Sequence, residues 1–491
     1  MVSPVWSVFQ VAMFNLGRVI VSFSLAFLVP MAWAWVQDSP ELVRVWGGCF
    51  ALTLVSGGLV WWRGSRHRCE LKARDGFLLV NLVWLTLPAY SALPLWLTVP
   101  DITWVKAYFE AMSALTATGA TALSGLDNLP VSVNVWRCFL QLIGGLGIML
   151  LVVAVLPMLG LGGMQLYKAE TPGPMKDDRF TPRIAETARG LWGVYFVLSL
   201  ACVVAYRWAG MNWADAFMHM CTTMGLGGFS SHDASFGFWN SPRIEAVAIV
   251  FMVLSGISFV RYFMVIRSRS LRPIWSDREI RAYVVVLLGS VCLVAGHLLF
   301  AGVFPTWQEA LRNSAFHVVS VATTTGYAST DYALWPAFVP VWLMFLGCFV
   351  SCAGSTGGGI KMVRMVLLVK QARRELVRII HPRVVNPVSL GRKALPPTVM
   401  TAVLGFMLIY GAITVGLTML MLLSGLDLVT GFSAVIATVN NIGPGLGAVG
   451  PASNFGVLSE FQLVVLTFAM MLGRLELLSV LVLFVGAFWR R

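Results

Sequence analysis

Long apolar stretches separated by short polar segments dominate the chain. Several stretches approach or exceed the roughly 20 residues that an α-helix needs to cross a bilayer, for instance 76–98, 138–159, 190–206, 282–304 and 398–423. Lipid offers the backbone no hydrogen-bonding partner, and the alternation of a barrel strand is absent, so we predict helices for these stretches. The pattern therefore predicts an all-α polytopic membrane protein.

The first 30 residues are apolar and have neither a basic start nor a small-residue cleavage site. We interpret their hydrophobic part as a retained first span and not as a signal peptide. With the next apolar stretch they predict an N-terminal two-helix unit within residues 1–70, with helices near 10–36 and 46–62.

The remainder of the chain repeats one order of parts four times. Each unit has an apolar span, a segment too short to cross, a stretch rich in glycine, threonine or asparagine, and a second span. The short segments predict re-entrant pore helices at 104–114, 213–222, 306–323 and 428–438. The polar stretches are 115–127, 222–233, 322–331 and 438–450. We place the four parallel repeats at 71–165, 185–268, 279–380 and 395–491.

The four polar stretches lie at what their apolar flanks predict to be membrane depth. Irregular backbone is tolerated there only where protein buries it or where it lines a watery cavity. Any single stretch could be a kinked helix that tolerates a glycine. Four equivalent stretches can surround one axis, where carbonyl oxygens replace a cation's hydration shell and glycine permits the required dihedral angles. The repeat therefore favours a single cation pore.

Charge is scarce and unevenly placed. Only 12% of the 491 residues are charged, far below the roughly 25% of a soluble domain, and the mean hydropathy is +0.80. The net charge of +13 comes mostly from the last two residues and from clusters in alternate connections, at 63–74, 168–189, 267–281 and 361–393. The positive-inside rule makes these connections and both termini cytoplasmic. Their basic face suits anionic lipid headgroups or an acidic partner, and we expect no nucleic acid.

Several motifs resemble those of the Trk/Ktr/HKT superfamily of potassium transporters. They are the four polar stretches, "AGSTGGGIK" (353–361) and "MLGRLEL" (471–477), and the resemblance extends from about residue 10 to the end. The extra N-terminal helical pair resembles the Trk type and not the shorter Ktr type.

The resemblance implies a potassium selectivity filter with one glycine per repeat. The aligned glycines are Gly119, Gly227, Gly326 and Gly443. The carbonyl-bearing residues before them are Ala117, Thr118, Gly225, Leu226, Thr324, Thr325, Asn441 and Ile442. The fourth stretch lacks the threonine run of the first and third. The second offers further glycines, so its filter glycine could be Gly225 or Gly228.

A glycine-rich break interrupts the apolar stretch 337–380. It superficially resembles a phosphate-binding loop, but Lys361 follows isoleucine and no strand is predicted before it, which argues against nucleotide binding. One alternative is a glycine-relaxed packing crossing. The family uses this stretch as an intramembrane gate beneath the filter, which implies a gate of Gly354, Ser355, Thr356, Gly357, Gly358 and Gly359.

Arg474 lies near the middle of the last apolar stretch, 460–488. A charge there costs at least about 2.5–3.5 kcal/mol. An ion pair with Glu476 or another acid is one explanation, although residues two apart on a helix do not face each other. The resemblance instead implies a pore-facing arginine below the filter that weakens ion occupancy.

Other residues with chemical potential have simple alternatives. Three acids after the filter glycines could attract cations or cap the following helices: Asp127, Asp233 and Asp331. Three histidines lack metal-ligand spacing and are interpreted as structural: His219, His232 and His317. The eight cysteines are scattered, which favours apolar packing over a disulfide or metal set.

The leading hypothesis is potassium uptake across the bacterial inner membrane, with potassium as the transported ion and no bound cofactor. The alternative is a secondary cation transporter coupled to protons or sodium, although parallel repeats and scarce deep acids disfavour it. An intramembrane enzyme would need a nucleophile with its base or an H-E-x-x-H pair, and the sequence offers neither. The resemblance further implies a homodimer and a cytosolic nucleotide-binding regulatory subunit (TrkA-like).

Overall fold

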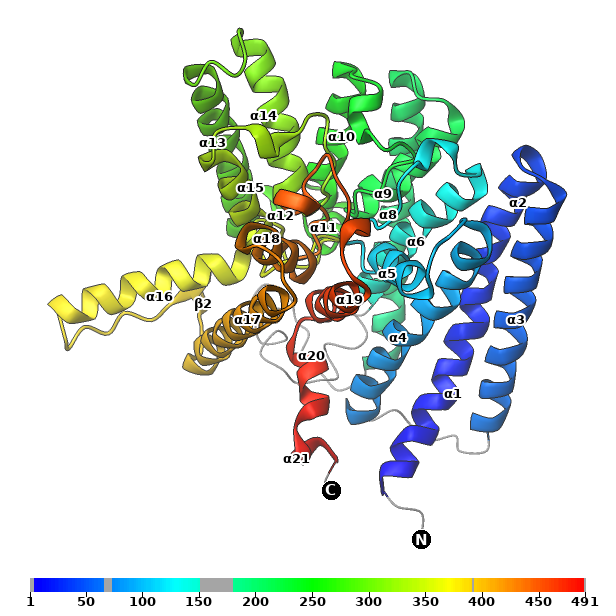
Figure 1. The fold of residues 1–491 in the computed structure, drawn as a ribbon. Helices are drawn as coiled ribbons and strands as arrows, with labels where there is room; N and C mark the ends of the chain where they lie inside the picture. Colours follow the sequence, from blue (N-terminus) through cyan, green and yellow to red (C-terminus); the bar gives the residue numbers. More distant parts are fainter. Residues whose placement is uncertain (1–3, 66–72, 151–179, 391–392, 490–491) are drawn as a thin grey trace.

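The structure, a computed structural model, describes residues 4–65, 73–150, 180–390 and 393–489. Helices make up nearly all of its regular structure (Figure 1). Two short strands, β1 (Ser389–Leu390) and β2 (Lys393–Ala394), pair antiparallel after α16 (Met362–Ile380). The predicted end of the first repeat, at 151–165, lies outside the described residues, as does most of the basic cluster at 168–189. The all-α polytopic prediction is confirmed.

The N-terminal unit is a pair of long helices at one edge of the molecule (Figure 1). The first runs through α1 (Pro4–Ser24), η1 (Leu25–Phe27) and α2 (Leu28–Gln37), and it packs against α3 (Pro40–Gly64). A Cβ at Gly17 would lie within 3.0 Å of the Trp61 backbone. Small residues allow such close backbone approach between membrane helices.

Four helical units follow, and in each a long helix precedes a half-helix. The long helices are α4 (Ala73–Thr98), α8 (Phe180–Ala209), α13 (Arg278–Phe300) and α17 (Pro397–Leu423). The half-helices are α5 (Trp104–Leu115), α9 (Trp213–Gly225), α14 (Trp307–Ala322) and α18 (Leu428–Val439). These half-helices coincide closely with the four predicted short segments.

Each half-helix begins at a polar cap of the same geometry. The side chain of the residue before the helix accepts a hydrogen bond from a backbone N–H in the first turn. The caps are Thr103, Asn212, Thr306 and Asp427. After each half-helix and its loop comes a short 3-10 helix: η2 (Leu126–Asn128), η5 (Ser235–Phe238), η6 (Tyr332–Leu334) and η7 (Gly447–Val449).

The second helices of the units are less regular. In the first unit, α6 (Val131–Leu150) leads into residues outside the described ranges. In the second, α10 (Pro242–Ser255) and α11 (Phe259–Ser268) meet at 82°. In the third, α15 (Phe338–Phe349) is separated from α16 by an irregular segment. In the fourth, α19 (Glu460–Arg474) turns by 107° into Leu478–Phe484, which begins with α20 (Leu478–Leu481).

The last apolar stretch, 460–488, is therefore sharply bent and not one straight helix. α19 ends at Arg474, and Glu476 and Leu477 have positive φ angles of 55° and 26°. Both limbs of the turn are apolar, so hydropathy alone does not reveal it. The remaining short elements are α12 (Arg272–Trp275), η8 (Phe455–Val457), η9 (Val482–Phe484) and α21 (Gly486–Trp489).

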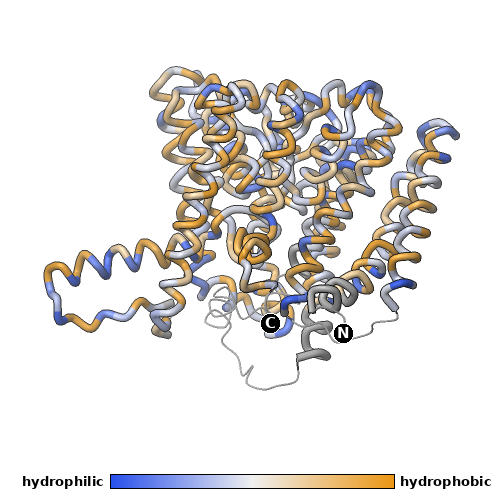
Figure 2. The backbone as a smooth tube through the Cα atoms, turned by 60° about the horizontal axis from the view of Figure 1, so that its bottom comes forward, coloured by the Kyte–Doolittle hydropathy of each residue, from blue (hydrophilic) through white to orange (hydrophobic). Residues whose placement is uncertain are grey.

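The described part of the chain contains six helices long and apolar enough to cross a membrane, or up to eight if each bent pair is one span. Figure 2 shows apolar positions along most of the helical body. In contrast, α16 extends away from that body and carries interspersed hydrophilic positions. This arm follows the irregular segment of the third unit.

Candidate functional site

The residues after the half-helices form four glycine loops, 116–125, 226–234, 323–331 and 440–446. Each contains two left-handed backbone positions, two residues apart, close to the end of its half-helix. The first position has φ angles of 50°, 51°, 62° and 52° at Ala117, Leu226, Thr324 and Asn441. The second has φ angles of 82°, 75°, 86° and 107° at Gly119, Gly228, Gly326 and Gly443. Glycine adopts such angles without the penalty that other residues incur.

One backbone hydrogen bond fixes the first limb of every glycine loop. The N–H between the two left-handed positions donates to a carbonyl in the last turn of the half-helix, over 2.8–2.9 Å. These bonds join Thr118 to Ser113, Gly227 to Thr222, Thr325 to Ser320 and Ile442 to Ala437. The four loops therefore share one backbone register.

This register corrects the alignment of the second loop. Gly228, and not Gly227, is the backbone equivalent of Gly119, because both occupy the second left-handed position. Gly225 still belongs to α9. The sequence alone offered three glycines within four residues, and only dihedral angles and hydrogen bonds distinguish them.

The four glycine loops contact one another in a closed ring. A Cβ at the second left-handed position of each loop would lie within 3.0 Å of a carbonyl oxygen in the next loop. Space and dihedral angle therefore both require glycine. The four contacts run from Gly119 to Gly227, from Gly228 to Thr325, from Gly326 to Ile442, and from Gly443 to Thr118.

The irregular stretch between α15 and α16, residues 350–361, packs against the first limbs of this ring. We call it the α15–α16 segment. The Gly358 N–H donates to the Thr324 hydroxyl over 2.8 Å. The Thr356 hydroxyl donates to the Met224 carbonyl over 3.0 Å. The predicted gate residues 354–359 are thus brought against two of the predicted filter regions.

Hydrogen bonds connect the α15–α16 segment and the start of α16 to neighbouring helices. Glu279, at the start of α13, accepts hydrogen bonds through Oε1 from the N–H groups of Ala353 (2.8 Å) and Val363 (3.2 Å). Backbone bonds of 3.1 Å and 3.0 Å connect the segment to the bend between α10 and α11, from Cys352 to Gly256 and from Phe259 to Gly354. The α15–α16 segment and the α10–α11 bend therefore meet beneath the ring.

Comparisons with known proteins match this architecture. A sequence model of the TrkH family, described as "Cation transport protein", matches residues 48–491. The chain belongs to the TrkH family. Its resemblance to Trk-type proteins is thereby confirmed, and it is a membrane transport protein and not an enzyme.

Individual relatives cover nearly the whole chain. The "Trk system potassium uptake protein TrkH" of Salmonella typhimurium is 42% identical over 476 residues, covering 96% of this chain and 98% of the relative. The Escherichia coli protein TrkG is 38% identical, covering 96% and 97%. The crystal structure of the potassium transporter TrkH from Vibrio parahaemolyticus matches with a TM-score of 0.90 at 39% identity, covering 98% of this chain and 100% of that one.

In this TrkH-family chain, Arg474 joins the α15–α16 segment to α6. Its guanidinium is buried and donates to the carbonyls of Thr356 and Gly144, each over 2.9 Å. Glu476 pairs instead with Arg364 over 2.7 Å. No carboxylate among the described residues lies within ion-pair distance of Arg474. The ion pair considered between Arg474 and Glu476 is therefore not formed, since the helix ends between them.

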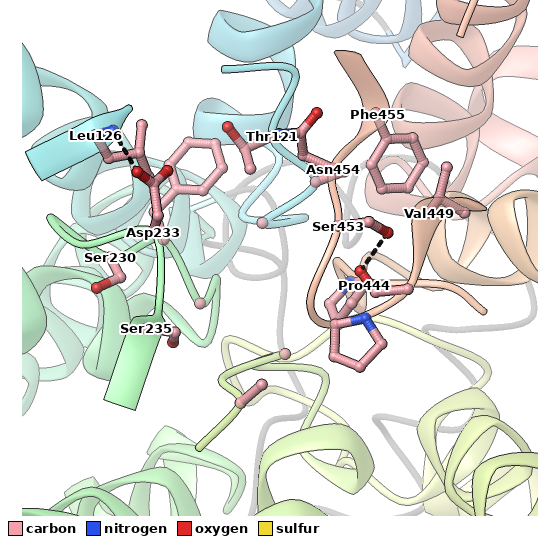
Figure 3. A pocket seen from close by; sticks show the side chains of 18 of the residues that line it. Thr121, Leu126, Ser230, Asp233, Ser235, Pro444, Val449, Ser453, Asn454 and Phe455 are labelled. Carbon is pink, nitrogen blue, oxygen red and sulfur yellow. Dashed lines mark hydrogen bonds between the residues drawn. The ribbon is translucent and has the colours of Figure 1, made fainter. Parts of the chain in front are cut away.

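A cavity of about 80 Å³ lies at the return limbs of the loops, the residues that follow the second left-handed position (Figure 3). All four units contribute to its lining. Asp233 lines it and accepts a 3.0 Å hydrogen bond from the Leu126 N–H. The cavity gives the ring a polar, accessible face opposite the α15–α16 segment.

The three acids predicted on this side have separate partners. Asp127 bonds to the imidazole of His232 and accepts a 3.2 Å hydrogen bond from the backbone N–H of Asp233. Asp331 instead caps η6 by accepting the N–H of Ala333 over 3.0 Å. The structure thus brings two of the three acids together, and the third serves as a helix cap.

His232 bridges two carboxylates between the first two units. Nδ1 contacts Asp127, Nε2 lies 3.4 Å from Asp215, and the ring stacks on Phe238 with centroids 3.6 Å apart. Burial disfavours the charged imidazole and is the largest single influence. The hydrogen bonds and charges of Asp215 and Asp127 together outweigh it and raise the pKa of His232.

Sequence reasoning missed two charged residues beside the loops. Glu110 on α5 and Arg137 on α6 form an ion pair of 2.7 Å, and both side chains are fully buried. A signal was available, because an ionisable residue inside an apolar membrane segment is a functional candidate by default. Glu279, which bonds to Ala353 and Val363, was also missed, and it lies in a charged stretch before an apolar span.

Proposed function

We propose that this chain is the potassium-conducting membrane subunit of a bacterial Trk uptake system. The closed ring of four glycine loops is the observation that carries the proposal. Rings of backbone carbonyls can replace the hydration shell of a permeating cation. The potassium uptake function printed for the relatives supports potassium as the transported ion.

We assign ion coordination to the two left-handed positions of each glycine loop and the residue between them. The common register and the close contacts between loops support this choice, because they fix the carbonyls of all four units relative to one another. The proposed filter residues are Ala117, Thr118, Gly119, Leu226, Gly227, Gly228, Thr324, Thr325, Gly326, Asn441, Ile442 and Gly443.

The α15–α16 segment is the proposed gate. Its hydrogen bonds to Thr324 and Met224 support a role in closing the path at the first limbs of the ring. Arg474, which bonds to this segment, would lower cation occupancy there through its charge. The gate residues are Gly354, Ser355, Thr356, Gly357, Gly358 and Gly359.

The basic connections support an orientation in the bacterial inner membrane with both termini cytoplasmic. Arg267 is exposed at the end of α11, and Arg269 and Arg272 are exposed between α11 and α13. Arg373 and Arg378 are exposed on α16. α16 leads directly from the proposed gate to this basic surface. A nucleotide-binding regulatory subunit that docked there could move the gate. The family resemblance supports such a partner and a homodimer. It also supports four repeats, at 71–165, 185–268, 279–380 and 395–491.

The test is cation flux in proteoliposomes that contain the purified protein. We expect potassium and rubidium to move down a potassium gradient after an uncoupler has collapsed the proton gradient, with sodium much slower. Flux that stops with the proton gradient would favour the coupled transporter. Absence of potassium flux with and without cytosolic extract and nucleotide would refute the proposal.

The gate has its own test in the same vesicles. A variant lacking residues 355–358 removes the hydroxyl that bonds to Met224 of α9 and the N–H that bonds to Thr324 of the ring. We expect higher flux without the regulator. Unchanged basal flux in a folded variant would remove the gate assignment and leave the ring assignment intact.

A further inference from the structure

The half-helices carry polar side chains that reach the return limbs of their own loops. Counting back from the first left-handed position of each loop, Glu110, His219, His317 and Ala434 occupy equivalent places. The first three are fully buried polar residues. Buried polar groups that are retained in an apolar setting normally have specific hydrogen-bonding partners.

The first and third units use this place in the same way. Glu110 Oε2 accepts the N–H of Ala122 over 2.9 Å, and His317 Nε2 accepts the N–H of Ser329 over 3.3 Å. The sequence separation is 12 residues in both cases. His317 Nε2 also accepts the N–H of Thr330 over 3.4 Å. A carboxylate and an imidazole thus make equivalent bonds.

The histidines act as neutral acceptors. His317 Nδ1 lies 2.8 Å from the Asn313 carbonyl, and His219 Nδ1 lies 2.9 Å from the Asp215 carbonyl. A carbonyl only accepts, so Nδ1 carries the proton and Nε2 is free to accept. In the second unit, Nε2 of His219 receives the Ser230 hydroxyl over 3.0 Å.

In the fourth unit, Ser433, the residue before Ala434, makes the hydrogen bond to the return limb. Ala434 has no polar atom to offer, but Ser433 Oγ accepts the N–H of Leu446 over 2.8 Å. Leu446 lies on the return limb of the fourth glycine loop. Every unit therefore has at least one side-chain acceptor that joins its half-helix to its return limb.

The carboxylate of the first unit needs a countercharge because it is buried. Arg137 supplies it over 2.7 Å and also donates to the Thr121 hydroxyl (3.2 Å) and the Ser230 carbonyl (3.3 Å). Its guanidinium lies 4.5 Å from the ring centroid of Phe229. Arg137 therefore connects the return limbs of the first and second loops.

We propose that Glu110, His219, His317 and Ser433 are positioning residues that set cation selectivity, one in each unit. Backbone hydrogen bonds fix the first limb of each loop, and these side chains fix the return limb. Together they define the spacing of the carbonyls between the limbs. The inference rests on the proposed potassium filter.

The decisive variant is His317→Leu, which removes the acceptor for the N–H groups of Ser329 and Thr330. Because the return limb then loses two hydrogen bonds to its half-helix, we expect the potassium-over-sodium permeability ratio to fall by about threefold to tenfold. His317→Gln restores an acceptor oxygen and should recover most of the ratio. His297→Leu is the matched control, since His297 of α13 packs on Phe338 of α15, away from the loops.

Permeability ratios are compared with thermal unfolding of the same purified samples. A folded His317→Leu protein with the wild-type ratio would overturn the proposal, even if its unfolding temperature falls. A lowered ratio that Gln does not recover would also overturn it, because the acceptor would then not be the cause.

The first unit gives an independent test. Glu110→Gln leaves the Arg137 charge uncompensated, whereas Glu110→Gln with Arg137→Gln removes both charges. We expect the single variant to lower the permeability ratio by about threefold and the double variant to recover part of it, since the two sites are directly coupled. If the double variant has the same permeability ratio as the single variant, Glu110 is not a positioning residue in this unit.

A Gly326→Ser variant distinguishes failure of the positioning proposal from failure of the filter proposal. If Gly326→Ser alters selectivity and the acceptor variants do not, the positioning proposal is wrong and the filter proposal stands. If none alters selectivity, the proposed filter itself fails.

Discussion

The ring of glycine loops and the α15–α16 segment beneath it are both irregular, glycine-rich and buried, yet they are held in different ways. Each loop is fixed by its own half-helix, through bonds such as Thr325 to Ser320. The segment is also fixed by residues of other units, such as Met224, Phe259 and Arg474. Local bonds make the ring a property of each unit, whereas the segment depends on how the units are placed.

This difference suits a fixed filter and a movable gate. A loop bonded within its own unit keeps its shape when helices shift relative to one another. A segment bonded to α13, to the α10–α11 bend and to α19 loses partners when any of these moves. Bistable packing of this kind converts small helix displacements into discrete rearrangements.

The largest effect should come from the ring itself. Ser in place of Gly326 would adopt a φ angle of 86° and place its Cβ against the Ile442 carbonyl. Such backbone strain costs on the order of 1–3 kcal/mol, so we expect the potassium-over-sodium permeability ratio to fall by about tenfold. Gly302→Ser is the control, because its φ angle of 70° is similar but its Cβ would meet open space. Equal ratios in the two variants would contradict the ring assignment.

The next effect should come from Glu279. Glu279→Ala leaves the N–H groups of Ala353 and Val363 without this acceptor. We expect flux without the regulator to rise by about fivefold, because the closed arrangement of the segment loses stability. Glu279→Gln keeps an acceptor oxygen and should rise less. If flux falls or the ion permeability ratio changes instead, the contrast between ring and segment is wrong.

Arg474→Ala should have a smaller effect of the same sign. The variant frees the carbonyls of Thr356 and Gly144, but it also removes a buried charge whose desolvation opposes the closed arrangement. We expect flux to rise by about threefold, or its voltage dependence to change, with assembly intact. Planar-bilayer currents measure both. Loss of folded protein without conducting remainder would indicate a purely structural role.

The smallest effect concerns pH at the cavity side of the ring. Because the pKa of His232 is raised by Asp215 and Asp127, its stabilising contribution is complete below the unfolded pKa of about 6.5 and is lost as pH rises through the folded pKa. We expect the thermal unfolding temperature to fall by about 1–3 °C as pH rises above the folded pKa of His232. His232→Gln should remove that pH dependence, and His381→Gln, at an exposed position after α16, should retain it. Identical pH profiles for wild type and His232→Gln would show that His232 is not the group responsible.

Much of the ring follows from local sequence. The caps Thr103, Asn212, Thr306 and Asp427 precede apolar segments too short to cross, and each segment runs into glycines and small polar residues. These signals act over one or two helical turns, so they can be recognised without knowing the fold. They placed the half-helices and three of the four loop registers.

Other features were decided only by the tertiary structure. Gly228 could be chosen over its neighbouring glycines only from the hydrogen bond of Gly227 to Thr222. The turn after Arg474 separates two limbs that are alike in hydropathy. The ion pair of Glu476 with Arg364 joins residues that are far apart in sequence. Hydropathy reports an average preference for lipid or protein, whereas these features depend on which specific groups meet when separate units pack together.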